Sequence, residues 1–171
     1  MVLDIQGEWH LVASASTNSE IEFIGEEPDP NGITNWLNGF DDTLVDSAKS
    51  TSGLVLTIQS DGTFTEVVSG KPEVYWFDEE GVLQTEVTPF NGVVAPSGSA
   101  NYLRPVDIAK WAKPVEELYS PAILRYDDGD TKISDRVHVN SGKLIRTVNT
   151  VTDELYLDRV VIVYGRSANA S

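Results

Sequence analysis

Apolar and polar residues alternate at the start of the chain. A period of two is typical of a β-strand with one face in water. The pattern therefore predicts an opening strand in which Trp9 points inward and His10 points outward. The apolar set is Leu3, Ile5, Gly7, Trp9, Leu11 and Ala13, and Asp4, Gln6, Glu8 and His10 lie between them.

The chain ends in two long runs rich in β-branched residues, 143–151 and 155–165, joined by Thr152-Asp153-Glu154. This pattern predicts a closing hairpin. Residues 160–164 are apolar on both faces of the last strand, so the outer face must also be covered. A helix from residues 105–119 could cover it, and so could the second subunit of a homodimer.

Further hairpins fill the middle of the chain. Ser60-Asp61-Gly62 separates two alternating runs, which is a strong hairpin signal. Residues 89–98 contain Pro89, Asn91-Gly92 and Pro96-Ser97-Gly98 and are interpreted as a loop. The remaining strands are predicted at 54–58, 64–68, 74–77, 82–88, 100–104, 122–126 and 131–139.

Two segments carry apolar residues at helical spacing. Between Ile33 and Ala48 they recur every three or four residues, which predicts one or two short helices interrupted near Gly39. Residues 105–119 form the second such segment. We expect these helices to lie across the mouth of a barrel. The predicted fold is thus all-β, a single domain spanning 1–171: an antiparallel up-and-down β-barrel of about nine or ten strands with short helical lid insertions.

The charge narrows the range of partners. The formal net charge is −15, which repels phosphate backbones and anionic lipid headgroups, so neither a nucleic acid nor a membrane is an expected partner. There are no cysteines, which excludes disulfides and thiolate chemistry. The first residues lack a basic region and an apolar stretch of signal-peptide length, and this favours a cytoplasmic protein.

The two ends of the chain also resemble a known group. Gly7-Glu8-Trp9, followed by Leu11-Val12, is similar to the Gly-x-Trp opening strand of the calycins, which include the lipocalins and fatty-acid-binding proteins. The hairpin at 144–163 looks like their closing hairpin. The resemblance implies an Arg from the last strand packed near the opening Trp, and Arg159 and Arg166 are the two matches. The Arg-x-Tyr ligand clamp of fatty-acid-binding proteins is absent from the last strand, so the resemblance implies the fold and not the ligand.

Three charged residues lie on strands that we expect to line the barrel, and we name them as candidate catalytic residues. Asp135 shares its parity with Ile133 and Val137. An inward carboxylate is costly unless it is paired, so Asp135 is a ligand contact or general base, or the partner of an arginine, or is turned outward by a strand bulge. Arg146 and Arg159 are the two candidate arginines. The parity of 143–151 leaves open which face points inward, and Arg159 fits the cavity and the outer face equally well.

Four aromatic residues are candidate ligand contacts: Trp76, Tyr126, Trp36 and Trp111. Trp76 and Tyr126 lie on predicted strands and suit the wall of an apolar pocket, although each also fits a plain core. Trp36 and Trp111 lie on the helical segments and could close the mouth or simply anchor the helices. Only His10 and His138 are present, both with outward parity, and no metal site or cofactor is expected.

These observations favour a barrel that binds a small hydrophobic molecule in its cavity, and an inward arginine would suit an anionic one. The alternative is an enzyme, a cofactor-independent cyclase or isomerase in biosynthesis that folds a flexible hydrophobic substrate. Such catalysis needs confinement and one or two polar groups rather than a recognisable motif. The sequence therefore leaves the choice between binder and enzyme open. A third alternative is a pure interaction protein that uses the two apolar faces of the last strand.

Overall fold

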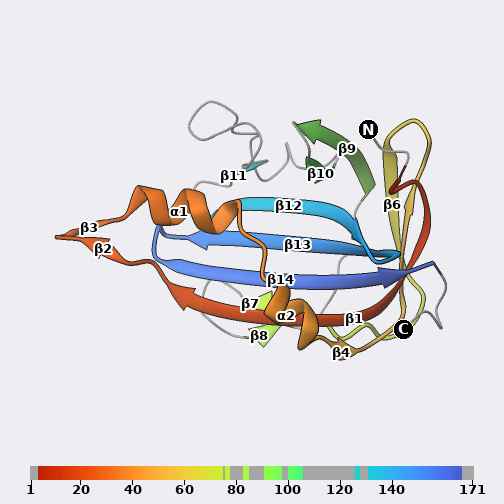
Figure 1. Cartoon of the computed structure of the whole chain (residues 1–171), viewed down its shortest axis with the longest axis horizontal. Helices are drawn as coiled ribbons and strands as arrows, with labels where there is room; N and C mark the ends of the chain where they lie inside the picture. The colour runs from red at the N-terminus through yellow and green to blue at the C-terminus, as the bar shows by residue number, and fades with distance from the viewer. Residues whose placement is uncertain are drawn as a thin grey trace.

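The fold is built almost entirely from antiparallel β-strands (Figure 1). The computed structural model describes residues 4–74, 76–77, 83–84, 91–97, 100–105, 126–127 and 131–166. Of the helix predicted at 105–119, Pro105 is the last residue of a strand, and the rest lies outside these residues.

Eight strands form a closed barrel in which each strand pairs with the next one along the chain. The cycle closes because β1 pairs with β14, and β10 pairs with β12. The predicted all-β antiparallel barrel is confirmed by this pairing, with eight strands in the cycle rather than nine or ten. Its strands are β1 (Gly7–Glu20), β5 (Leu54–Ile58), β6 (Thr63–Val68), β9 (Asn91–Ser97), β10 (Ala100–Pro105), β12 (Thr131–Asn140), β13 (Lys143–Thr152) and β14 (Tyr156–Gly165).

The other described elements are short. Two of them, α1 (Pro30–Leu37) and α2 (Asp42–Asp46), are helices, and neither is long and apolar enough to cross a membrane. Asp29 caps α1 by accepting from the amide of Asn31, and Asp41 caps α2 by accepting from that of Leu44. The short strands are β2 (Phe23–Ile24), β3 (Glu27–Pro28), β4 (Lys49–Ser50), β7 (Trp76–Phe77), β8 (Leu83–Gln84) and β11 (Tyr126–Asp127).

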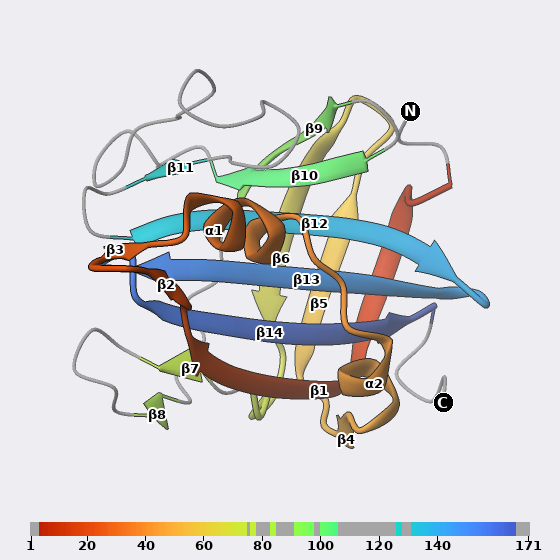
Figure 2. The ribbon, with the colours of Figure 1, turned by 60° about the vertical axis from the view of Figure 1, so that its left-hand side comes forward.

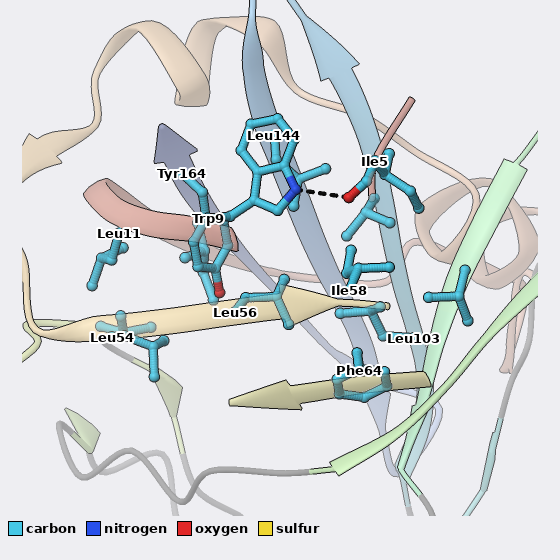
Figure 3. Close-up of a cluster of buried hydrophobic side chains, with 14 of the residues drawn as sticks. Ile5, Trp9, Leu11, Leu54, Leu56, Ile58, Phe64, Leu103, Leu144 and Tyr164 are labelled. Atoms are coloured by element: carbon cyan, nitrogen blue, oxygen red, sulfur yellow. Dashed lines mark hydrogen bonds between the residues drawn. The ribbon is translucent and has the colours of Figure 1, made fainter. Parts of the chain in front are cut away.

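A buried apolar cluster extends through the barrel interior from the end that holds Trp9 (Figure 3). Trp9 is at its centre, 1% exposed, and its indole Nε1 donates to the carbonyl of Ile5 at 2.7 Å. The inward position predicted for Trp9 is therefore confirmed. Leu144 and Tyr164 belong to the same cluster, which joins the opening strand to the closing hairpin.

A β-bulge at Val12 changes which residues of β1 point inward. The pairing with β14 shifts there, because Leu11 lies opposite Tyr164 and Ala13 lies opposite Val163. Odd-numbered residues point inward before the bulge and even-numbered residues after it. The inward position predicted for Ala13 is therefore wrong: Val12 and Ala13 both pack on the outer cluster of α2, whereas Ser14 takes the inner position.

Both described helices lie against the outer face of the barrel (Figure 2). The helix α1 packs Ile33 and Leu37 on Val151 and Leu157. The helix α2 brings Leu44 and Val45 onto the second outer cluster, which includes Val161. The lid position predicted for the helical segment between Ile33 and Ala48 is wrong, because both helices pack their apolar side chains on the apolar outer faces of β13 and β14. The same packing covers the outer face of the last strand within one chain.

The strand β9 occupies residues that the sequence pattern assigned to a loop. Its pairing with β6 ends at Val93, whereas its pairing with β10 continues to Ser97. At Pro96 the strand therefore pairs with β10 alone. A proline, which lacks a backbone N–H, is tolerated at such an edge position. Gly92 lies opposite the buried Phe64. The turn-forming residues of this segment thus fit into β9 because one edge of β9 is unpaired over part of its length.

Candidate functional site

A charged network lies inside the barrel, around Arg146. Its Nε and Nη2 donate to the two carboxylate oxygens of Asp135 at 2.9 and 2.7 Å, and Nη1 donates to Glu66. The same Nη1 lies 3.5 Å from the hydroxyl of Tyr164. The side chains of Arg146, Asp135 and Glu66 are 9%, 3% and 2% exposed. The structure therefore settles the orientation of β13: Arg146 points inward, and it is the partner that the inward Asp135 requires.

The strand register brings these groups together. Asp135 lies on β12 opposite Val148, and Arg146 lies opposite Val137, so the arginine crosses to its carboxylate between two adjacent inner positions. Glu66 comes from β6, which is not adjacent to β12 or β13 in the sheet. Sequence reasoning missed Glu66, although it shares its parity with Phe64 and could have been found by the same argument as Asp135.

Burial and the neighbouring charges of opposite sign shift the pKa values of Asp135 and Arg146 in opposite directions. Burial raises the pKa of Asp135, and the charge and hydrogen bonds of Arg146 only partly offset this effect. Burial alone would lower the pKa of Arg146, but the charges of Asp135 and Glu66 raise it well above its ordinary value. Burial likewise raises the pKa of Tyr164. One guanidinium faces two carboxylates, so the network has an excess of negative charge whenever both are ionised.

The inner face becomes polar and accessible away from Trp9. Ser14 is buried and donates to the carbonyl of Glu73 at 2.8 Å. Asp158 is half-buried. Burial raises its pKa, and a hydrogen bond with the side chain of Thr150 only partly offsets this rise. Exposure increases along the inner positions in the order Ser14, Ser16, Asn18 on β1 and Val160, Asp158, Tyr156 on β14. The inner positions of β1 and β14 farthest from Trp9 are therefore exposed to solvent, and we call this end of the barrel the open end.

Arg159 lies on the outer face, beneath α1, and so does not line the interior with Arg146. Its Nε donates to Asn149 at 2.6 Å and its Nη2 donates to the carbonyl of Trp36 at 3.0 Å. Its guanidinium carbon lies 3.9 Å from the ring centre of Trp36. A Cβ on Gly39 would lie 2.5 Å from Nη2 of Arg159, so only glycine leaves room for this approach. Of the two interpretations of Arg159, the outer-face one is correct.

A second outer arginine completes this contact. Arg136 donates to the side-chain oxygen and to the carbonyl of Asn38, each at 3.0 Å, and lies 3.5 Å from the ring centre of Phe40. Asn149 donates to the carbonyl of Gly39 at 3.0 Å. Carbonyls at the end of a helix have no partners within the helix, and positive groups are favoured there. The buried polar groups of the outer face therefore fix the end of α1.

His138 lies beside the same contact, on the outer face as predicted. Its ring forms an edge contact with Phe40 at 4.6 Å, and its Nδ1 is buried without a hydrogen-bond partner. Burial, and secondarily the charge of Arg136, lower the pKa of His138. Among the described residues, no group of three or more His, Asp or Glu side chains is placed to hold a metal ion.

The predicted aromatic contacts divide into two groups. Trp36 is described fully: its Nε1 donates to the carbonyl of Asp158 at 3.1 Å, and it anchors α1 to the outer face instead of closing a mouth. The backbones of Trp76 and Tyr126 lie in β7 and β11, but their side chains are outside the described part of the structure. Trp111 lies outside the described residues altogether.

Arg166 makes the contact that the resemblance implied for the last strand. Its guanidinium carbon lies 3.6 Å from the ring centre of Trp9, and its Nη1 donates to the carbonyl of Gln6 at 2.8 Å. The Trp9–Arg166 pair therefore closes the barrel at the end opposite the open end. Of the two arginines that matched this role, Arg166 fills it.

Comparison with known proteins gives matches among solved structures only. No protein-family model matches the chain, and no curated protein matches its sequence. The zebrafish ileal bile acid-binding protein, solved in complex with cholic acid, is 11% identical to this chain. The match covers 96% of this chain and 99% of that one, with a TM-score of 0.33. The closed eight-stranded barrel itself is shown by the strand pairing of this chain.

Proposed function

We propose that the barrel binds a small hydrophobic molecule in its interior, with the polar end of that molecule against the network of Arg146, Asp135 and Glu66. One observation carries this proposal: a charged network is buried in the interior of a barrel, and the inner positions of β1 and β14 become polar and exposed toward one end. Burying such a network costs more than filling the same space with apolar side chains. Perturbed ionisable groups of this kind are typical of functional sites.

The charge balance favours a neutral or cationic polar end over an anionic one. Arg146 already faces two carboxylates, so a ligand carboxylate would bring a further negative charge against a single buried cation. Asp158 adds a third carboxylate on the inner face. The anionic ligand expected from an inward arginine is therefore not the ligand that we propose.

A pair of fluorescent probes tests both parts of the proposal. N-phenyl-1-naphthylamine is neutral and apolar, and 8-anilino-1-naphthalenesulfonate is the same ring system with a sulfonate. We expect the neutral probe to bind with enhanced emission and the sulfonate to bind about tenfold more weakly or worse. Tighter binding of the sulfonate would contradict the proposed charge preference. Native mass spectrometry of the purified protein would show in parallel whether it retains a ligand.

Two matched variants locate the bound probe. Val148 lies on the inner face beside Asp135, so Val148→Trp should fill the interior and abolish binding of the neutral probe. Val67 is 57% exposed on the outer face of β6, and Val67→Trp should leave binding unchanged. Equal binding by both variants would place the probe outside the barrel and refute the proposal.

Catalysis of a cyclisation or isomerisation stays a prediction from the sequence. Asp135 has a raised pKa, which suits a general acid. Both of its oxygens, however, accept hydrogen bonds from Arg146, which favours a binding role over proton transfer.

A further inference from the structure

A small hairpin projects beyond the open end of the barrel, formed by β2 and β3 (Figure 1). It presents two apolar side chains to solvent, since Phe23 is 51% exposed and Ile24 is 66% exposed. Large apolar side chains that are adjacent and exposed at a projecting tip are typical of a contact site for another molecule.

The base of this hairpin is firmly attached to the barrel. Ile21 is buried against Val151 and Leu157, and its amide donates to the carbonyl of Leu155 at 2.8 Å. On the other side, the amide of Asp29 donates to the carbonyl of Glu22 at 2.9 Å, and Asp29 caps α1. The tip is therefore held in a fixed position, so that docking would order few additional groups.

The exposed charged side chains around the tip, among the residues that the structure describes, are all acidic. No Lys or Arg occurs before Lys49 in the sequence, and none occurs between Arg146 and Arg159. The hydrogen bond from Ile21 to Leu155 brings these two acidic stretches together. The exposed acidic residues around Phe23 and Ile24 are Glu20, Glu22, Glu26, Glu27, Asp153 and Glu154.

We propose that the tip, Phe23 and Ile24 with these six acidic residues, is a docking surface for another protein that presents an apolar patch flanked by Lys and Arg. An apolar centre with a charged rim is the usual arrangement of a protein interface, and complementary charge selects the partner. A second copy of this chain would bring six further acidic residues against the six already present. The same charge opposes anionic membranes. A basic protein surface is the occupant that this chemistry fits.

The test uses the full chain and a defined probe in place of the unidentified partner. The probe is a synthetic peptide of alternating Leu and Lys, and the control peptide is alternating Ser and Lys. We expect the first to bind, by fluorescence anisotropy, with an affinity that falls as salt rises, and the second to bind about tenfold more weakly or worse. Equal binding of both peptides would show that the surface binds through nonspecific charge attraction alone, and it would overturn the proposal.

Two pairs of variants locate the binding site on the surface. Phe23→Ser with Ile24→Ser should weaken the Leu-Lys peptide about tenfold or more, whereas Val67→Ser with Val68→Ser, at another exposed apolar pair, should not. Glu26→Gln with Glu27→Gln should weaken binding and its salt dependence.

The neutral control for that charge change is Asp4→Asn with Asp46→Asn, which alters exposed acids away from the tip. Unfolding curves of all variants verify that the barrel is intact. The proposal is wrong if the tip variants bind like the wild type. It is also wrong if light scattering shows a dimer that the Phe23 and Ile24 changes dissociate, because the occupant would then be a second copy.

Discussion

The guanidinium of Arg166 stacks on the indole of Trp9, 3.6 Å from its ring centre, and joins the residue directly after β14 to the first strand. The same arginine donates to the carbonyl of Gln6 at 2.8 Å. Gly7 follows with φ of +119°, and a Cβ there would lie 2.5 Å from Nη1 of Arg166. The glycine and the tryptophan of the opening motif are thus both explained by one contact at the closed end of the barrel.

Removing this contact should destabilise the barrel without affecting its interior. Arg166→Ala should lower the free energy of unfolding by about 1 kcal/mol, because an exposed cation–π contact and one hydrogen bond are lost. Arg166→Lys should retain part of that stability. Urea unfolding followed by Trp fluorescence measures both, and an Arg166→Ala protein as stable as the wild type would show that the contact contributes nothing.

The buried network should be sensitive to the loss of its one cation. Arg146→Met leaves Asp135 and Glu66 buried without a counter-charge, and we expect a loss of about 3–5 kcal/mol in unfolding free energy. Combining it with Asp135→Leu and Glu66→Leu should recover most of this loss, since no charge then remains buried. If the triple variant is no more stable than Arg146→Met, lost packing and not charge is the cause.

Asp135 should give the barrel an unusual dependence on pH. Its folded pKa is raised above the ordinary value of 3.8, so the folded state binds more protons than the unfolded state between those two values. Stability from this group therefore rises as pH falls through its raised pKa and is fully gained below 3.8. The wild type should become more stable relative to Asp135→Asn as pH is lowered over this range. Parallel urea curves of the two proteins test this, and a constant difference would contradict it.

Arg159 should act on α1 alone. Arg159→Met removes its hydrogen bonds to Trp36 and Asn149, and we expect a loss of about 1–3 kcal/mol together with faster hydrogen exchange of the amides of α1. Affinity for the neutral naphthylamine probe should change by no more than about twofold, because Arg159 lies outside the barrel. A loss of probe binding as large as that of Val148→Trp would mean that the outer face takes part in the site.

The turn between β13 and β14 carries avoidable strain. Asp153 and Glu154 both have positive φ, at 56° and 55°, a conformation that costs a side-chain-bearing residue about 1 kcal/mol or more. The corresponding turn between β12 and β13 uses Ser141 and Gly142 with similar angles. Glu154→Gly should therefore raise the unfolding free energy by up to about 1 kcal/mol, and Gly142→Ala, the reverse change, should lower it. Urea unfolding of both variants checks the two directions.

The alternation of apolar and polar residues along the chain predicts much of this fold. Trp9 and Asp135 were placed correctly because alternation in a strand fixes which side chains share a face. Arg146 and Arg159 could not be separated, because β13 and β14 are apolar on both faces and parity then has no preferred direction. The outer helices explain those two-faced strands, but their position depends on contacts far apart in the sequence.

Two local features escaped sequence reasoning for different reasons. The segment Ala13-Ser14-Ala15-Ser16 continues the alternation of the residues before it, with the apolar residues at odd positions, so nothing in it reveals the bulge at Val12. Glu66, in contrast, follows the alternation of β6 and was open to prediction. Its role became visible only when the barrel brought β6 to face Arg146.

The bulge at Val12 also sets the chemical character of the open end. Without this one extra residue, Ala13, Ala15 and Thr17 would take the inner positions that Ser14, Ser16 and Asn18 now occupy. Removal of this one residue would therefore replace an inner row of hydroxyl and amide groups with a row dominated by methyl groups. The polarity of the inner face of a barrel can thus be altered by insertion or deletion of one residue in a wall strand, with no substitution at any inner position.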